Sequence, residues 1–534
     1  MQIQKSKISY AQSNYFSKLI LDYLAGKEEL KEFYTSLPEL DSFAKAIEAK
    51  SQETINRNLL VEVLEQQYKR GNCNLPSDSI QLLKSENTFT VTTGHQLCLF
   101  TGPLYFLYKI ITSINLAEEL KKKYKQYNFV PLYWMASEDH DFAEINHIHL
   151  FGKKLSCSTE PSENSIAVGK ISTQQVDSML SELKTVLGES ENAKQLIALY
   201  EKAYKSSQNL ADATRLLVHE LFKSYGLVIL DADDTRLKKE FASILLDDIK
   251  NQSNFKLVNE SISKLEALGY KAQVNPRAIN CFYMTDKIRE RIVFEQGMYK
   301  VNNTELSFTE AEIETEFKNH TERFSPNVVL RPLYQEKILP NLAYIGGGGE
   351  LAYWLEYKSM FDFHRLQFPL LVLRNSVLFA DTASAEKWKK FSFTEQEYFS
   401  PTEELIKVFI AKNSSEDISL KEEQEKLKTV FSTVIAKAHR LDATLKAPAE
   451  AELQKALAAL SNLENKMLKA EKQKQETSLN QIKKIKEKLF PENELQERYD
   501  NFSGFYLKYG NDFIAALKEN LAPLDFNFTL LTAS

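Results

Sequence analysis

The sequence predicts an α/β fold, a largely parallel β-sheet with helices on both faces, followed by an α-helical coiled-coil domain. Short apolar runs typical of buried strands alternate with helical stretches up to residue 374. Polar clusters follow directly after four of these runs, where an open α/β sheet binds its ligands. From about residue 395 the composition shifts toward Lys, Glu, Ala, Leu and Gln, with apolar residues three and four positions apart.

The N-terminal part predicts helices and then a strand–helix–strand unit. Tyr, Phe and Leu recur at helical spacing over 8–70. A strand is expected over 88–93, a helix from Pro103 to about Tyr124, and a second strand over 129–136. Proline suits a first helical turn, where its missing N–H would have no partner.

The middle of the chain predicts further strands and a hairpin. Gly226–Asp231 is a short apolar strand that ends in acid, followed by Asp233 and Asp234, and Cys281–Met284 has strand composition. Gln296-Gly297 is a turn signal between two apolar runs. A capping box is expected at Thr309 and Glu312. The elements that close this part are a strand over Asn327–Arg331, a helix over 350–361 and a buried strand over Pro369–Arg374.

Length and composition limit the class of protein. A chain of 534 residues exceeds one ordinary core, so two or more domains are expected. The net charge of −6 argues against a sequence-independent nucleic-acid binder. Four scattered cysteines suit neither a disulfide scaffold nor structural zinc. Without an apolar signal segment or a membrane-length apolar run, we expect a cytoplasmic protein and no membrane partner.

The C-terminal part predicts a helical hairpin. Ala447-Pro448 would connect two helices that fold back antiparallel, and Pro491 would end the second. A single hairpin leaves apolar surface exposed, so it should pack on the core or on a second copy, and a homodimer through the coiled coil is expected. Phe526–Leu531 predicts a strand that returns to the body. The two apolar seams are Leu427, Val430, Val434, Ile435, Ala438 and Leu441, then Leu453, Ala456, Leu460, Leu463, Met467 and Ala470, with a phase shift before Leu479.

A glycine-rich loop is the first candidate binding element. Gly346, Gly347, Gly348 and Gly349 precede a helix whose free N–H groups and positive dipole end suit phosphate or carboxylate. The alternative is a tight strand-to-helix turn without a ligand. Glu350 fits both interpretations, because acids are favoured in a first helical turn.

An acidic cluster is the second candidate. Asp139, His140 and Asp141 follow a predicted strand directly, with Glu144, Asn146 and His147 shortly after. Neighbouring carboxylates and an imidazole can supply a general base for an amine or hydroxyl. A metal site of Asp139, His140, His147 and His149 matches no familiar motif, so no metal is expected. The remaining alternative is a solvated acidic loop, with His147 and His149 alternating along a strand.

Two further groups of polar residues lie beside predicted strand ends. Gly94, His95 and Gln96 follow the first strand, at a corner where a histidine contacts phosphate in nucleotidylyl-transferring folds, although a lone histidine is more often bonded to the backbone. The other group could bind carboxylates, since arginine offers a bidentate fork, or could form structural ion pairs. Its members are Arg331, Gln335, Arg374 and Asn375.

Four ordered blocks resemble the bacillithiol biosynthesis cysteine-adding family, BshC. Thr93–Tyr105 resembles its T-G-x-Q-x-x-L-x-T-G-P signature, and Trp134–His147, Ser325–Pro332 and Tyr344–Tyr353 match further blocks at the right separations. The chain departs from the pattern at His95, where glutamine is frequent, and at Gly348, where proline is frequent.

The resemblance implies a Rossmann-like core with inserted connecting segments and a coiled-coil domain in a homodimer. We expect the core over 1–390, with N-terminal helices over 1–80 and insertions within about 150–220 and 265–325. The coiled-coil domain is then 391–510, and 511–534 returns to the core.

The resemblance also implies a ligase that adds L-cysteine to the glucosamine amine of glucosaminyl malate, the last step of bacillithiol biosynthesis. In that reaction Asp141 or His140 is the expected base, and Arg331 with the glycine loop would hold the malyl carboxylates. Gly94, His95 and Gln96 would hold the sugar hydroxyls or, if ATP is the activator, its phosphates. ATP is a possible activator, although no Walker A motif occurs and an acyl carrier could replace it. Two alternatives stay open: a nucleotidyl transferase of related architecture, and a non-catalytic assembly factor whose coiled coil is its working part.

Overall fold

The computed structural model describes residues 1–157, 166–414 and 419–533. These residues form two compact units, which we call the core unit (1–379 with 495–534) and the hairpin unit (380–494). Residues 158–165 of the predicted 150–220 insertion, and 415–418 of the predicted helical domain, lie outside the described residues.

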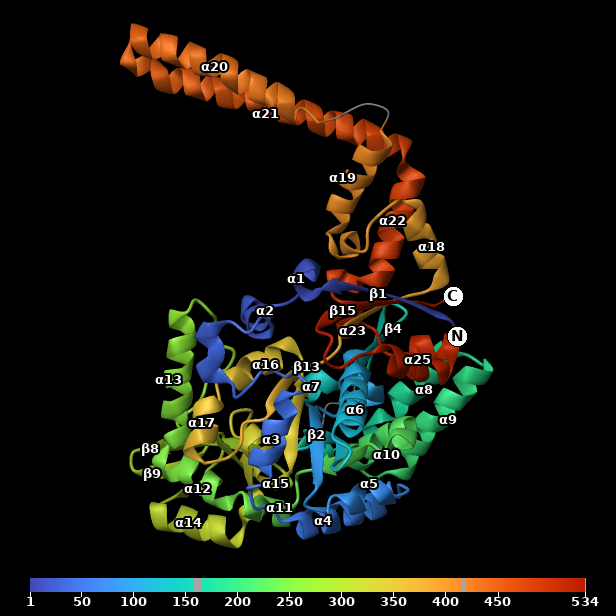
Figure 1. The fold of residues 1–534 in the computed structure, drawn as a ribbon, viewed down its shortest axis with the longest axis vertical. Coiled ribbons are helices and arrows are strands. Elements are labelled where there is room, and N and C mark those ends of the chain that lie inside the picture. The colour runs from blue at the N-terminus through green and yellow to red at the C-terminus, as the bar shows by residue number, and fades with distance from the viewer. Residues whose placement is uncertain (158–165, 415–418, 534) are drawn as a thin grey trace. The chain divides into compact units, whose positions relative to one another are not determined.

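The core unit contains a five-stranded sheet in which all neighbouring strands are parallel, in the order β13-β12-β2-β3-β6. Its strands consist almost entirely of buried residues, as expected for a parallel sheet covered by helices on both faces. The predicted fold class is therefore confirmed (Figure 1). The strands are β2 (Thr88–His95), β3 (Asn128–Met135), β6 (Val228–Asp231), β12 (Asn341–Gly346) and β13 (Leu370–Leu373).

The strand order reverses beside β2. From β2 the chain adds β3 and β6 on one side and later adds β12 and β13 on the other. The strands also end level with one another, since His95 pairs with Met135 and Met135 with Asp231. A reversal of this kind opens a crevice at the carboxyl ends of the strands, which is where such sheets bind ligands.

Helices on the sheet bury its apolar side chains. α6 (Tyr105–Lys123) packs on β2 and β3, and α3 (Ser42–Lys50) packs on β12. α4 (Arg57–Arg70) and α10 (Leu210–Phe222) pack on β6. Phe89, Val91, Leu116, Ile345 and Val372 belong to one fully buried cluster across these elements.

A second five-stranded sheet is antiparallel, with the order β10-β9-β8-β7-β11. The predicted turn is confirmed: Gln296 and Gly297 both have positive φ and connect β8 to β9. The capping box of Thr309 and Glu312 is also confirmed, at the start of α14 (Glu310–Asn319). The strands are β7 (Cys281–Met284), β8 (Arg289–Glu295), β9 (Met298–Val301), β10 (Ser307–Phe308) and β11 (Phe324–Pro326).

The strand predicted over Asn327–Arg331 is wrong. β11 ends at Pro326, and α15 (Arg331–Ile338) begins at Arg331 with Pro332 in its first turn. The Asn327 side chain accepts hydrogen bonds from the backbone N–H groups of Val329 and Leu330. Such local bonds compete with strand pairing, so the apolar Val-Val-Leu run forms a turn.

The helix predicted over 350–361 is two helices, α16 (Gly348–Leu355) and α17 (Lys358–Phe363). The C-terminal strand prediction is confirmed by β15 (Asn527–Ala533), which pairs antiparallel with β1 (Ile3–Ser9) in a sheet that also contains β14 (Val377–Ala380). A further hairpin joins β4 (His147–Leu150) and β5 (Lys153–Ser156). The other core α-helices are α1 (Tyr10–Ser13), α2 (Lys18–Leu24), α5 (Ser77–Leu82), α7 (Phe142–Ile145), α8 (Asp177–Leu187), α9 (Glu191–Ser206), α11 (Thr235–Glu240), α12 (Ala242–Asn251), α13 (Ser253–Ala267), α23 (Gln496–Tyr499), α24 (Ser503–Tyr509) and α25 (Asp512–Asn520).

The hairpin unit contains the predicted coiled coil. α20 (Lys421–Leu441) and α21 (Lys446–Lys474) lie side by side and antiparallel (Figure 1). The antiparallel direction is seen in two hydrogen bonds, from the Leu420 N–H to Glu464 and from the Gln424 side chain to Ser461. The connection is at 442–445, and Pro448 lies in the first turn of α21 rather than in a linker. α18 (Thr382–Lys390), α19 (Thr402–Asn413) and α22 (Glu476–Leu489) complete the unit.

Burial differs within this unit. Neither α20 nor α21 contains a buried residue, whereas α22 buries Leu479, Ile482, Ile485 and Leu489. The phase shift predicted before Leu479 therefore marks a change from an exposed to a buried seam. Among the helices of the described residues, none is long and apolar enough to cross a membrane.

Candidate active site

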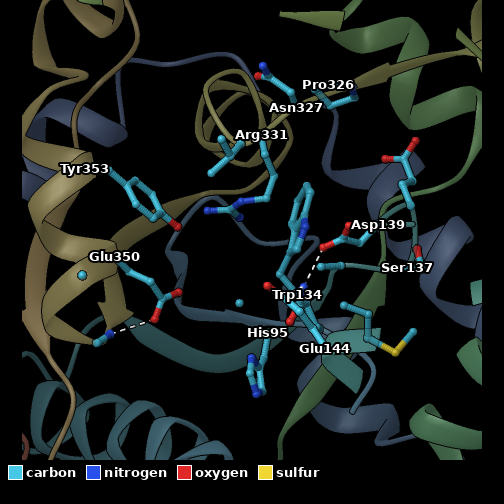
Figure 2. A pocket seen from close by; sticks show the side chains of 18 of the residues that line it. His95, Trp134, Ser137, Asp139, Glu144, Pro326, Asn327, Arg331, Glu350 and Tyr353 are labelled. Atoms are coloured by element: carbon cyan, nitrogen blue, oxygen red, sulfur yellow. Dashed lines mark hydrogen bonds between the residues drawn. The ribbon is translucent and has the colours of Figure 1, made fainter. Parts of the chain in front are cut away.

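A cavity of about 810 Å³ lies in the core unit at the carboxyl ends of β2, β3 and β12 (Figure 2). Three of the four predicted polar clusters contribute to its wall: the end of β2 with Gln96, the loop after β3 and the glycine-rich loop after β12. The predicted site residues that line it are Gly94, His95, Gln96, Asp139, His140, Glu144, Arg331, Gly347, Gly349 and Arg374.

Two carboxylates converge on Gln96. Its side-chain nitrogen donates to Asp139 Oδ2 at 2.8 Å and to Glu144 Oε2 at 2.6 Å. Asp139 Oδ1 also accepts from the backbone N–H groups of His140, at 2.7 Å, and Asp141, at 3.3 Å. Burial acts to raise the pKa of Asp139, but the bond from Gln96 and the charge of Arg289 outweigh it and keep the pKa below its usual value. Asp139 is thus an ionised group directed at the cavity.

His140 contacts an arginine from the antiparallel sheet. Arg289 Nη1 lies 2.9 Å from His140 Nδ1, and Asp139 Oδ1 lies 3.8 Å from the same nitrogen. Burial and the positive charge of Arg289 lower the pKa of His140. The ring is therefore uncharged at neutral pH.

A fully buried lysine, Lys238, stabilises the loop after β3. Lys238 Nζ lies 2.6 Å from Glu138 Oε1 and 2.7 Å from Asp233 Oδ1, and it donates to the Glu322 carbonyl at 3.0 Å. Burial acts to lower the pKa of Lys238, but the two carboxylates outweigh it and raise the pKa. Ser137 in the same loop donates to Asp231. The fourth predicted cluster, Asp231–Asp234, therefore supports the cavity wall without lining it.

The glycine-rich loop is stabilised by Glu350. This carboxylate accepts from the Gly347 N–H at 2.8 Å and from Tyr344 Oη at 2.8 Å, and it pairs with Lys109 at 2.6 Å. Burial acts to raise the pKa of Glu350, but Lys109 outweighs it and the pKa is lowered. A side chain at Gly346 would crowd its neighbours, because a Cβ there would lie 2.9 Å from Leu351 Cδ2.

Two arginines that line the cavity each have one buried N–H group without a hydrogen-bond partner among the described residues. Arg331 Nη1 donates to Gln335 at 3.0 Å, while its Nη2 has no hydrogen-bond partner among the described residues. Arg374 Nη2 donates to Glu497 at 2.8 Å, while its Nε is likewise unpartnered within the described chain. Figure 2 shows Arg331 reaching into the pocket between Tyr353 on one side and Trp134 and Asp139 on the other. Buried N–H groups without partners are costly, so an anion is the natural occupant.

The charge of the lining also favours an anion. Its acids are Glu138, Asp139, Glu144 and Glu350, and its cations are Lys109, Arg277, Arg289, Arg291, Arg331, Arg374 and Arg498. The cations exceed the acids by three (seven minus four). Within the described residues, no group of three or more His, Cys, Asp or Glu side chains is arranged to hold a metal ion.

His95 lines the cavity without bringing charge to it. Its ring packs near Tyr105 and Phe106, and its Nε2 lies 3.8 Å from Cys98 Sγ. Burial, together with the nearby Lys109 charge, lowers the pKa of His95 to about 3. His95 is therefore uncharged at neutral pH, and its pKa does not support an ionic contact with a phosphate.

Seven predicted site residues do not line the cavity. Asp141 Oδ1 accepts from the Glu144 N–H and caps α7, and Asn146 and His147 lie together at the start of β4. Gln335 orients Arg331. The remaining three residues contact other parts of the fold. Gly346 ends β12, and Gly348 faces Phe16 and Ile20. The Asn375 side chain accepts a hydrogen bond from Thr112 and donates one to the Ala522 carbonyl.

Several lining residues escaped prediction from sequence. Lys109, which lines the cavity, is the single cation in the mostly apolar run Tyr105–Leu116. A lone charge in such a run could have indicated a functional residue. Arg289 and Arg291 belong to an ordinary charged stretch before a turn, which carries no such signal. Tyr353 faces the cavity, whereas Trp354 is fully buried.

Two family models together match almost the whole chain. The Bacillithiol biosynthesis BshC N-terminal Rossmann-like domain matches residues 1–375, and the BshC C-terminal coiled-coil domain matches residues 377–533. Proteins from Flavobacterium johnsoniae, Christiangramia forsetii and Cytophaga hutchinsonii are 47%, 46% and 40% identical, over 98% of this chain and 98–99% of each relative. Each bears the name "Putative cysteine ligase BshC". The chain therefore belongs to the BshC family of bacillithiol biosynthesis, and the resemblance seen in its four sequence blocks is confirmed.

Proposed function

We propose that this BshC-family protein joins L-cysteine to the glucosamine amine of glucosaminyl malate through an amide bond, as the last step of bacillithiol biosynthesis. Family membership and the names of its relatives support a cysteine ligase. The observation that carries the specific substrate is that two carboxylates and two arginines line one cavity, and that each arginine has an N–H group without a partner among the described residues.

This arrangement complements the two ends of glucosaminyl malate. The malyl group has two carboxylates, which suit Arg331 Nη2 and Arg374 Nε beside the glycine-rich loop. The sugar amine is a cation when protonated, and Asp139 and Glu144 would attract it. The three-charge excess of cations in the lining suits a substrate whose net charge is negative.

Amide formation needs an activated cysteine carboxyl group and an amine that has lost its proton. A carboxylate of the acidic cluster, Asp139 or Glu144, is suited to receive that proton, because both line the cavity. Asp141 is less suited than expected from sequence, because it caps α7 and does not line the cavity. The activating group would come from ATP or from an acyl carrier as a co-substrate.

The test combines cells and purified protein. After deletion of the gene, we expect cellular bacillithiol to disappear and glucosaminyl malate to accumulate, as measured by mass spectrometry, and the wild-type gene to restore the thiol. Purified protein given L-cysteine, glucosaminyl malate and either ATP or a cell extract should form the product. Unchanged bacillithiol in a cell without a second copy would reject the proposal.

A further inference from the structure

The contact between Arg289 and His140 determines where the histidine proton lies. A guanidinium group has only donors, so the 2.9 Å contact from Arg289 Nη1 requires His140 Nδ1 to accept. An accepting Nδ1 carries no hydrogen. In the neutral ring the single N–H is therefore at Nε2.

Arg289 is held firmly enough to impose this arrangement. It is only 6% exposed, and its Nε donates to Ser325 Oγ at 3.2 Å while its Nη2 donates to the Pro326 carbonyl at 3.4 Å. Its guanidinium also lies 3.9 Å from the centre of the Phe282 ring. If the Arg289 guanidinium moved away from His140, it would also lose its contacts with Ser325, Pro326 and Phe282.

Burial and the charge of Arg289 favour the neutral ring of His140. Asp139 and Asp141 from its own loop and Glu290 from β8 act to raise its pKa, whereas burial and Arg289 lower it, and the lowering dominates. A protonated ring would direct Nδ1–H at the guanidinium, so protonation would break the hydrogen bond. His140 also lines the cavity, and its side chain is 40% exposed.

We propose that Arg289 is a positioning residue that holds His140 as a hydrogen-bond donor through Nε2, and that His140 is not the base of the reaction. This inference rests on the proposed function, in which the amine nitrogen attacks the acyl carbon of activated cysteine. The carbonyl electron pair moves onto oxygen during attack and returns as the activating group leaves with its bonding pair. The amine proton passes to Asp139 or Glu144. The His140 Nε2–H stabilises the negative oxygen, a role that a neutral imidazole fills well.

The kinetic test separates a donor from a base. His140→Gln retains a side-chain N–H donor but cannot act as a base, whereas His140→Ala has neither property. We expect His140→Ala to lower kcat/KM by about 100-fold, in line with the loss of one oxyanion donor. His140→Gln should remain within about tenfold of wild type. His439→Gln, on an exposed position of α20, is the control. A glutamine variant as inactive as the alanine variant would overturn the donor role.

A spectroscopic test does not depend on the reaction. In ¹⁵N-histidine NMR spectra of the full chain, His140 is identified by the signals lost in His140→Gln. We expect an unprotonated Nδ1 and a protonated Nε2 in the wild type, and in Arg289→Met a mixture of tautomers with titration at higher pH. A protonated Nδ1 in the wild type would overturn the inference. If the wild type makes no product from cysteine and glucosaminyl malate, the proposed function fails, while the spectra still decide the role of Arg289.

Discussion

The cavity of the core unit and the α20–α21 hairpin use charged residues in opposite ways. Lys109, Arg289 and Arg374 at the cavity are 2%, 6% and 4% exposed, and each has a defined partner. The hairpin has no buried residue, and its ion pairs, such as Lys455 with Glu452, are solvated. Buried charge is costly to leave unpaired, whereas exposed pairs contribute little. The difference identifies the cavity as the region where single side chains matter.

The largest effect is expected where a buried charge would lose its partner. Lys238→Met leaves Glu138 and Asp233 without their shared cation, so the free energy of unfolding should fall by about 3–5 kcal/mol. Urea denaturation of the purified protein measures this change. Lys455→Met on α21 is the matched control and should leave the unfolding midpoint unchanged. A loss below about 1 kcal/mol for Lys238→Met would contradict the contrast between the two regions.

A second effect should appear in activity rather than in stability. Arg331→Lys keeps the charge but removes the free Nη2 donor, so kcat/KM for glucosaminyl malate should fall by about 100-fold, mainly through KM. Steady-state kinetics with a melting curve for each variant would show this. Arg440→Lys at the end of α20 serves as the control. Equal KM values for Arg331→Lys and wild type would remove Arg331 from substrate binding.

The smallest effect on activity is expected for the hairpin, where the sequence-based prediction of a homodimer can be tested. Val430, Val434 and Leu441 are 58%, 44% and 84% exposed, and their spacing puts them on one face of α20. Changing all three to Gln should convert a dimer into a monomer in light scattering, while kcat/KM stays within about twofold of wild type.

Lys428→Gln, at an exposed position in a pair with Glu425, should leave the assembly intact. A wild-type protein that is already monomeric would remove the dimer prediction. A large loss of activity in the monomer would show instead that the cavity depends on assembly.

The regular parts of the fold could be predicted because their signals are local. Strands β3 and β6 are apolar runs, β2 is rich in β-branched residues, and the hairpin helices repeat apolar residues at three and four. Asn327–Arg331 shows where local composition fails, because one asparagine side chain and Pro332 convert an apolar run into a turn and a helix. Strand propensity describes only average environments, and specific hydrogen bonds can override it.

The candidate site was predictable only in outline. Asp139 and Asp141 are two positions apart after the same strand, yet one lines the cavity and the other caps a short helix. Arg289 reaches His140 across 149 positions of sequence. No local pattern marks such a pair, since Arg289 begins β8 of the antiparallel sheet and His140 lies in the loop after β3.

The sequence by itself determined the alternation of strands and helices, the antiparallel helical hairpin and the family. These features depend on periodicity and on motifs, which are properties of neighbouring residues. Only the tertiary structure decided which polar groups share one cavity, which arginine donors lack a partner within the described residues and which side chain lies against His140 Nδ1. These features depend on burial and on contacts between distant segments, and both are set when the parallel strands bring their carboxyl ends to one edge of the sheet.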